Sequence, residues 1–250
     1  MNDTIYILDV GLSGLNVFTT LSKTFPKETF IYQNNLKYYP YSERPESEIK
    51  QLVAADINQA IESKPAFLII VSDIIIEHGE ELLQEIKIPF ILIDDIIVDY
   101  VNTNYEQKNM LLLARKEIID ANLYQKRFIY DRLYSIASDD LGRLIERKMT
   151  KTSESFQVTS KTLLNVIKKD IDVIITSSPY LINLRTEIRE YVDFSMITDI
   201  GTIIANKLNT ILKDRTEKRR GERIVKSSVP SKSFKEKAYW CDVKYRVREY

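Results

Sequence analysis

The sequence predicts an α/β fold made of two similar lobes, each a mostly parallel sheet flanked by helices. Short, β-branched apolar runs alternate with helical patterns through most of the 250 residues, and this alternation is typical of parallel sheets. These runs are apolar on successive positions, as expected where helices cover both faces of a sheet. The length also suits two lobes of roughly 100–150 residues each, with a cleft between them.

In the first lobe, apolar runs bounded by turn residues predict strands at 4–8, 29–32, 67–71 and 90–93. Pro65 and Pro89 come just before the third and fourth of these strands and mark the ends of the preceding helices. The expected helices cover Leu15–Thr24, Glu46–Ser63 and Gly79–Ile86.

In the second lobe, strands are expected at 109–113 and 173–176, with helices over Lys116–Tyr124 and Lys161–Lys169. A further helical stretch covers Thr202–Leu212. On this interpretation residues 1–95 and 205–250 form the first lobe, and residues 96–204 form the second.

Composition excludes several classes of function. Lys+Arg and Asp+Glu both total 36, so no global charge would draw the chain to nucleic acid or to an anionic membrane. No apolar run approaches the roughly 20 residues that span a bilayer. The N-terminal stretch enters a strand at once and has no basic segment before an apolar one, so we expect a cytoplasmic protein rather than a secreted one. With one Cys and one His, a disulfide, a thiolate metal cluster and a multi-histidine metal site are not expected.

Polar or turn residues follow five of the expected strands. In open parallel sheets ligands bind at these carboxyl ends, so the five clusters would together line one cleft. Each cluster alone is better explained as a helix cap, because Ser, Asp and Asn are preferred there. The clusters are Asp9-Val10-Gly11, Asn34-Asn35, Ser72-Asp73, Asp94-Asp95 and Ser177-Ser178.

The stretch KDRTEKRRG at 213–221 concentrates basic residues after a helical segment. It could bind nucleic acid, or it could be a solvated helix end whose cations complement the helix dipole. Because acidic residues are interleaved and the chain has no net charge, we favour the helix end and expect no nucleic-acid partner.

The stretch IYILDVGLSGLNVF at 5–18 resembles the opening of bacterial glutamate racemases, where the first strand runs into Asp-Ser-Gly-x-Gly-Gly-Leu. Val10 takes the place of the family serine, and Ser13 takes the place of one glycine. In IYQNNLKYYPYSER, the family has a Tyr, an Asp and Pro-Tyr-Gly at fixed distances. There Asn35 stands for the Asp and Ser42 for the Gly. The residues that match are Asp9, Gly11, Gly14, Leu15, Tyr32, Pro40 and Tyr41.

The resemblance continues through nearly the whole chain. MLLLARKEIIDANLY is similar to a family strand and helix, with Tyr124 matching and Arg115 in place of a threonine. LGRLIERK carries Glu146, which matches a family glutamate, and DVIITSSPY resembles Asp-x-x-x-x-Gly-Cys-Thr-His. The stretch 199–212 resembles a late family helix, and SSVPSKSFKEKA resembles the last strand and helix. The order and spacing of these matches imply the aspartate/glutamate racemase fold.

The resemblance implies that both catalytic cysteines are missing. The family moves a proton at the α-carbon of glutamate with two cysteines on opposite faces of the substrate, and it needs no cofactor. Ser72 occupies the position of the first cysteine and Ser178 that of the second, while Cys241 matches neither. A serine hydroxyl stays protonated at neutral pH unless an adjacent base takes its proton. We therefore assign no catalytic residue. Asp9 and Tyr180 are expected beside the two serine positions, and Tyr180 takes the place of a family histidine.

The resemblance also places changed side chains where the family hydrogen-bonds its amino acid. Val10, Ile74 and Pro179 are apolar there, and Asp73 adds a negative charge where a carboxylate would bind. Glu146 persists, as do Asp9, Gly11 and Pro40, which capping, a tight turn and a fixed backbone bend also explain. We interpret the following residues as a vestigial cleft: Asp9, Val10, Gly11, Pro40, Tyr41, Ser72, Asp73, Ile74, Ser178 and Pro179.

Two functions follow from this pattern. The first is a glutamate racemase homologue that has lost racemisation and binds a protein partner or a small acidic ligand. The second is an active isomerase or racemase of altered chemistry that uses Asp9, Ser72, Asp73, Ser178 and Tyr180 on glutamate or another acid. The resemblance also implies a homodimer, and it leaves open a role outside catalysis, since some members are reported to inhibit DNA gyrase.

Overall fold

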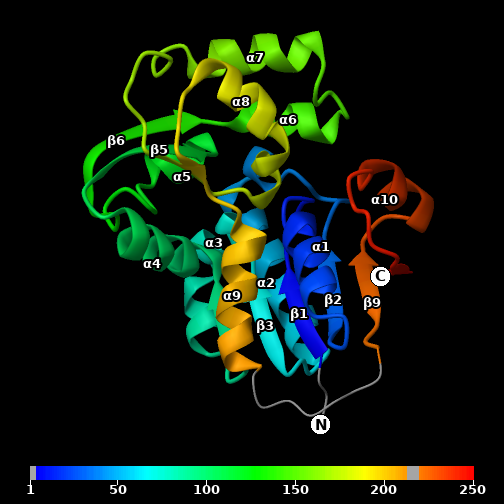
Figure 1. Ribbon diagram of the computed structural model, residues 1–250. Helices are drawn as coiled ribbons and strands as arrows, with labels where there is room; N and C mark the ends of the chain where they lie inside the picture. Colours follow the sequence, from blue (N-terminus) through cyan, green and yellow to red (C-terminus); the bar gives the residue numbers. More distant parts are fainter. Residues whose placement is uncertain (1–3, 213–219) are drawn as a thin grey trace. The chain divides into compact units, whose positions relative to one another are not determined.

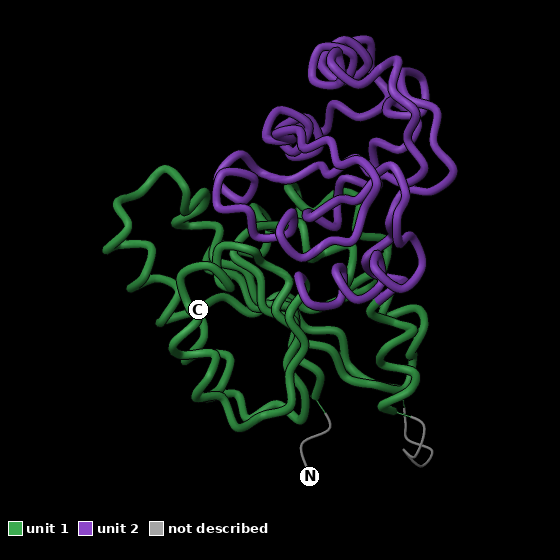
Figure 2. The backbone as a smooth tube through the Cα atoms, turned by 90° about the vertical axis from the view of Figure 1, so that its left-hand side faces the viewer, with its two compact units in different colours: residues 1–93, 204–250 green, residues 94–203 purple. Residues whose placement is uncertain are grey.

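Two sheets form the core of the computed structural model, which describes residues 4–212 and 220–250 (Figure 1). Within these residues every strand pair is parallel. The chain divides into two compact units, residues 1–93 with 204–250 and residues 94–203 (Figure 2). The α/β class with two parallel sheets is therefore confirmed.

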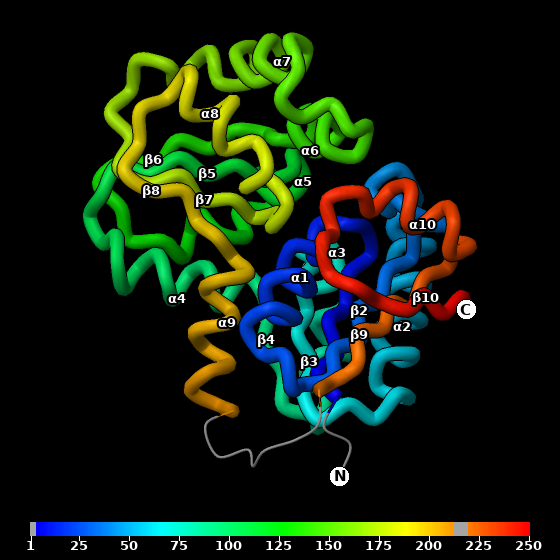
Figure 3. The backbone as a smooth tube through the Cα atoms, turned by 45° about the vertical axis from the view of Figure 1, so that its right-hand side comes forward, coloured from blue at the N-terminus to red at the C-terminus, as the bar shows by residue number. Residues whose placement is uncertain are grey.

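The first unit holds a six-stranded sheet in the order β10-β9-β2-β1-β3-β4. Its C-terminal part adds the two outer strands, and α10 lies beside them (Figure 3). The elements are β1 (Thr4–Leu8), α1 (Leu15–Thr24), β2 (Thr29–Asn34), the 3-10 turn η1 (Tyr41–Glu43), α2 (Glu46–Glu62), β3 (Phe67–Ile70), α3 (Asp73–Gln84), β4 (Phe90–Leu92), β9 (Arg223–Ser227), α10 (Ser231–Lys237) and β10 (Arg246–Glu249).

The second unit holds a four-stranded sheet in the order β6-β5-β7-β8. Its elements are α4 (Ile93–Tyr105), β5 (Lys108–Ala114), α5 (Lys116–Asp120), β6 (Tyr130–Ala137), α6 (Asp139–Glu146), α7 (Ser153–Leu163), β7 (Val173–Thr176), the 3-10 turn η2 (Pro179–Leu184), α8 (Arg185–Tyr191) and β8 (Met196–Ile197). The division between the units falls at the first residue of α4 and inside α9 (Ile200–Ile211).

The central strands are buried along their whole length, as the continuous apolar runs predict. Every residue of β1, β3 and β7 is buried. Neighbouring residues of β2 contact helices on opposite sides of the first sheet. The Tyr32 ring packs against Phe18 of α1 with centroids 5.8 Å apart, and the Gln33 amide donates to the Asp56 carbonyl of α2 at 3.3 Å. Successive side chains of a strand point to opposite faces, so α1 and α2 cover the two faces of this sheet.

Several element boundaries differ from the expectation. Helix α3 begins at Asp73 rather than Gly79, so the isoleucines after Asp73 form the buried first turn of a helix. Helix α7 ends at Leu163, before most of the stretch 161–169 that was expected to be helical. The strand before α10 is β9, which covers 223–227. It therefore ends at the first residue of SSVPSKSFKEKA, the stretch expected to contain the last strand.

Two sequence expectations concern partners. Among residues 4–212 and 220–250, no helix has the length and apolarity that crossing a membrane requires. Most of the basic stretch 213–221 lies outside the described residues, so the choice between a helix end and a nucleic-acid patch stays a prediction.

Candidate functional site

Asp9 follows β1 directly and holds the turn that leads into α1. One carboxylate oxygen accepts the backbone N–H of Val10 at 2.8 Å and of Gly11 at 3.2 Å. The other accepts the Gly14 N–H at 2.7 Å and the Tyr32 hydroxyl at 2.9 Å. Burial raises the pKa of Asp9, and these four donors oppose that rise. Because both carboxylate oxygens accept hydrogen bonds from the first unit, Asp9 stabilises the turn.

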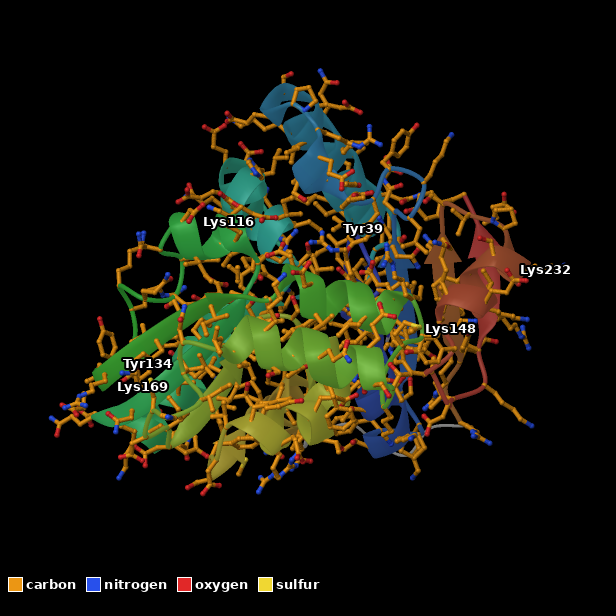
Figure 4. The ribbon with its side chains drawn as sticks, turned by 90° about the horizontal axis from the view of Figure 1, so that it is seen from above. Tyr39, Lys116, Tyr134, Lys148, Lys169 and Lys232 are labelled. Atoms are coloured by element: carbon orange, nitrogen blue, oxygen red, sulfur yellow. The ribbon has the colours of Figure 1, made fainter. Side chains whose placement is uncertain are left out.

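The two glycines of this turn lie against other side chains. A Cβ at Gly11 would stand 2.8 Å from the ring of Tyr39, a residue labelled in Figure 4. A Cβ at Gly14 would stand 2.3 Å from a methyl of Val71. Val71 is the residue between β3 and Ser72, so Gly14 permits close packing of the Asp9 turn on the end of β3. Gly11 likewise allows the Tyr39 ring to lie on the turn.

The turn after β2 places Tyr41 against α2. The Tyr41 side chain is fully buried, and its hydroxyl donates to the Asp56 carboxylate at 2.5 Å. Asn35 donates its side-chain amide to the other oxygen of Asp56 at 3.0 Å. Pro40, just before Tyr41, is half-buried, and the Tyr39-Pro40 peptide bond is cis. The family position Tyr41 is therefore tied to a buried carboxylate, Asp56, that the sequence did not single out.

The end of β3 carries Ser72, Asp73 and Ile74, all of which are buried. Ser72 is the N-cap residue of α3, but its side chain makes no capping hydrogen bond. Asp73 lies in the first helical turn, where a carboxylate complements the positive end of the helix dipole. The structure thus gives Asp73 a helix-start position and Ile74 a place in the core.

In the second unit, β7 ends in Thr176 and is followed by Ser177, Ser178 and Pro179. Ser178 is the N-cap residue of η2 and Pro179 begins this 3-10 turn, whereas the hydroxyl of the buried Ser177 has no hydrogen-bond partner in the described part of the chain. Tyr180 is 7% exposed, and its hydroxyl donates to Glu146 at 3.3 Å. The two matched positions Glu146 and Tyr180 are therefore brought together within one unit.

The pair Asp94-Asp95 lies in the first turn of α4 rather than at a free strand end. The guanidinium of Arg127 bridges the two carboxylates, at 2.5 Å from each. Burial and the neighbouring Asp95 raise the pKa of Asp94, and Arg127 opposes that rise. This cluster is an ion pair that fastens α4 to the segment before β6.

The single thiol lies far from the serine positions in sequence and packs on α1. The sulfur of Cys241 lies 3.4 Å from the hydroxyl of Thr19, across 222 residues of chain. Burial raises its pKa, so little thiolate forms at neutral pH. Neither the described residues around Cys241 nor those elsewhere in the described ranges include a group of three His, Cys, Asp or Glu side chains that could hold a metal ion.

The expected site residues fall in both units. Asp9, Val10, Gly11, Ser72 and Ile74 lie with their neighbours at the carboxyl ends of β1 and β3, whose last residues, Leu8 and Ile70, are paired. Ser178, Pro179 and Tyr180 lie at the carboxyl end of β7. A single cleft that joins the two sets stays a prediction.

No protein-family model matches the chain, but known glutamate racemases are similar to it in sequence and in structure. The glutamate racemase of Thermoanaerobacter sp. (strain X514) is 25% identical over 185 residues, which cover 68% of this chain and 66% of that protein, just under two thirds. The glutamate racemase of Glaesserella parasuis is 23% identical over 234 residues, which cover 86% and 83%. The crystal structure of glutamate racemase RacE1 from Bacillus anthracis matches with a TM-score of 0.83 at 20% identity, over 99% of this chain and 97% of that one.

The two α/β units have parallel sheets, and a racemase structure matches them over 99% of the chain. The protein therefore has the glutamate/aspartate racemase fold. Within that class, its similarity to curated relatives over most of the chain places it more narrowly. Those relatives are glutamate racemases, and the chain resembles that family in sequence over as much as 86% of its length.

Proposed function

We propose that this chain is a family member that no longer interconverts L- and D-glutamate and that it acts in the cytoplasm by binding a protein partner or a small acidic ligand. The observation that carries the proposal is the position of the thiol. The resemblance puts hydroxyls, Ser72 and Ser178, at both cysteine positions, and the chain's one thiol contacts Thr19 of α1. Two-base proton transfer at a weakly acidic C–H needs a resting base, and a serine hydroxyl does not provide one at neutral pH.

The remaining groups of the first unit support this proposal, because they are already used inside the protein. Asp9 accepts four hydrogen bonds from its own unit. Tyr41 donates its hydroxyl to Asp56. Freeing either group for an amino-acid substrate would leave a buried polar atom unpaired, which costs about 1–3 kcal/mol.

The test is exchange of the α-proton of L- and D-glutamate in heavy water, followed by ¹H NMR. We expect no exchange above the buffer blank, whereas the Glaesserella parasuis racemase, run alongside, exchanges both enantiomers. A Ser178→Ala variant distinguishes the chain's own activity from a contaminating host racemase. Exchange that scales with the amount of protein and disappears in Ser178→Ala would overturn the proposal.

An active enzyme of altered chemistry is the second candidate, and one contact favours it. Tyr180 and Glu146 keep a phenol and a carboxylate in hydrogen-bond contact, 3.3 Å apart, in the second unit, and both groups can act in acid–base catalysis. Its test is a thermal-shift screen of glutamate, aspartate and other dicarboxylic acids, because a ligand of the folded state raises the melting temperature. A hit whose shift is lost in Tyr180→Phe and kept in Tyr134→Phe would support this candidate; no hit, or a shift that Tyr180→Phe leaves unchanged, would count against it.

A further inference from the structure

A buried carboxylate, Asp56 of α2, faces the turn after β2. The side chain is 2% exposed. In the part of the chain that the structure describes, no ion pair joins Asp56 to a Lys, Arg or His. An ionised carboxylate in such surroundings must be stabilised by hydrogen bonds alone, or it takes up a proton.

All of its side-chain donors come from one short stretch of chain. The Tyr41 hydroxyl donates at 2.5 Å, the Asn35 amide at 3.0 Å and the Gln33 amide at 3.5 Å. These residues lie at the end of β2 and in the turn that follows, so Asp56 fastens both to α2. The Gln33 amide also donates to the Asp56 carbonyl at 3.3 Å, and its own oxygen accepts the Tyr6 hydroxyl at 2.5 Å.

One atom in this cluster is left without a partner. The side-chain oxygen of Asn35 is buried and accepts no hydrogen bond within the described residues. A protonated Asp56 would carry a donor that the ionised carboxylate lacks, and an amide oxygen can accept from it. Turning the Asn35 amide end for end brings its oxygen to where its nitrogen now stands, 3.0 Å from the Asp56 carboxyl. The Asn35–Asp56 hydrogen bond can thus form in both protonation states, with its direction reversed.

We propose that Asp56, Asn35 and Tyr41 form a buried proton-binding site that fastens the turn after β2 to α2 and takes up a proton in mildly acidic solution. Burial raises the pKa of Asp56 to about 6, while the Tyr41, Asn35 and Gln33 hydrogen bonds oppose that rise. The site does not depend on whether the chain racemises glutamate.

The other titratable groups around Asp56 come from three strands or the residues just after them, and from the turn after β2. Three phenols face Asp56, namely Tyr6 of β1, Tyr41 of η1 and Tyr250, which follows β10. Burial raises the pKa of each of them. Asp9, after β1, acts through space and raises the pKa of Asp56 further. The Lys226 ammonium of β9 lies over the Tyr6 ring and donates to Ser63, so it is separated from the carboxyl.

The experiment is an NMR titration of protein carrying ¹³C at the aspartate carboxyls, from pH 4 to 8. Because the chain has one histidine, His78→Gln serves as the background and removes the imidazole titration. We expect one carboxyl with a midpoint near 6, assigned by its loss in Asp56→Asn, and amide signals of residues 36–44 that shift with the same midpoint. A midpoint near 6 that persists in Asp56→Asn would overturn the proposal, as would the absence of any aspartate midpoint above about 5 in the folded parent.

Two further variants keep the test decisive if Asp56→Asn does not fold. Tyr41→Phe removes a donor to the ionised carboxylate, so the midpoint should move to higher pH. Tyr38→Phe is the matched control, because the Tyr38 ring lies beside Lys37 and Arg44 instead, and it should leave the midpoint unchanged. Equal midpoints in all three proteins would show that the titrating group is not in contact with Tyr41.

Discussion

A methyl group at position 14 tests how tightly the Asp9 turn packs on the end of β3. An ideal Cβ on Gly14 would lie 2.3 Å from a methyl of Val71 and 3.0 Å from an Asp9 oxygen, whereas unstrained carbon contacts begin at roughly 3.5 Å. The backbone of Gly14 has φ −67° and is open to any residue, so Gly14→Ala carries no backbone strain. Overpacking costs about 1–3 kcal/mol, and the lower entropy of the unfolded chain returns about 0.4–1 kcal/mol. We expect a net loss of about 1–2 kcal/mol.

A double-mutant cycle with Val71→Ala isolates this contact. Val71 is 2% exposed, and removing its two methyl groups costs about 2 kcal/mol through lost burial and the cavity left behind. If the new methyl of Gly14→Ala enters that cavity, the double variant should lose no more than about 2 kcal/mol, against a sum of about 3–4 kcal/mol. Urea unfolding of the four proteins at pH 7 measures the cycle. Losses that add to within about 0.5 kcal/mol would refute the packing of Gly14 on Val71.

Two further outcomes follow from the shifted pKa values. Burial raises the pKa of Asp56 from its ordinary value of 3.8 to about 6 in the folded protein, so its stabilising contribution is complete below pH 3.8 and is lost as the pH rises through 6. By urea unfolding, the parent should therefore lose about 2 kcal/mol more stability than Asp56→Asn between pH 4.5 and 7. Parallel stability curves for the two proteins would contradict this. Burial raises the pKa of Cys241, so iodoacetamide at pH 8 should label the folded protein more slowly than the urea-unfolded one, followed by mass spectrometry; equal rates would show an accessible thiol.

The sequence pattern predicted the fold because its signals are local. The strands at 4–8 and 173–176 and the helix at 15–24 have the bounds that periodicity predicts. Strand β6 (Tyr130–Ala137) escaped prediction because it is an edge strand. Most of its side chains are exposed or half-buried, and charged residues interrupt its apolar positions, so it has the composition of a loop.

The site could be predicted only as positions, because its contacts depend on tertiary structure. The resemblance located Tyr41, yet the partner that holds its hydroxyl lies on another element. One signal could have pointed to Asp56: in α2 it shares the buried stripe of Ile49, Val53, Ile57 and Ala60, where an apolar residue is expected. No comparable signal links Cys241 to Thr19, since the two are separated by 222 residues.

The family residues that this chain keeps differ from those it replaces in whether they contribute to the stability of the fold. Among the kept residues, Asp9 and Tyr32 are hydrogen-bonded to each other, and Tyr41 is hydrogen-bonded to Asp56. Loss of one member of such a buried pair costs about 1–3 kcal/mol, so folding alone is enough to retain them. Under the proposed loss of racemisation, positions that served only the reaction are free to change, and these include the two that now carry Ser72 and Ser178. Retention of Asp9 is therefore no sign of catalysis, and the test of activity belongs at the serines.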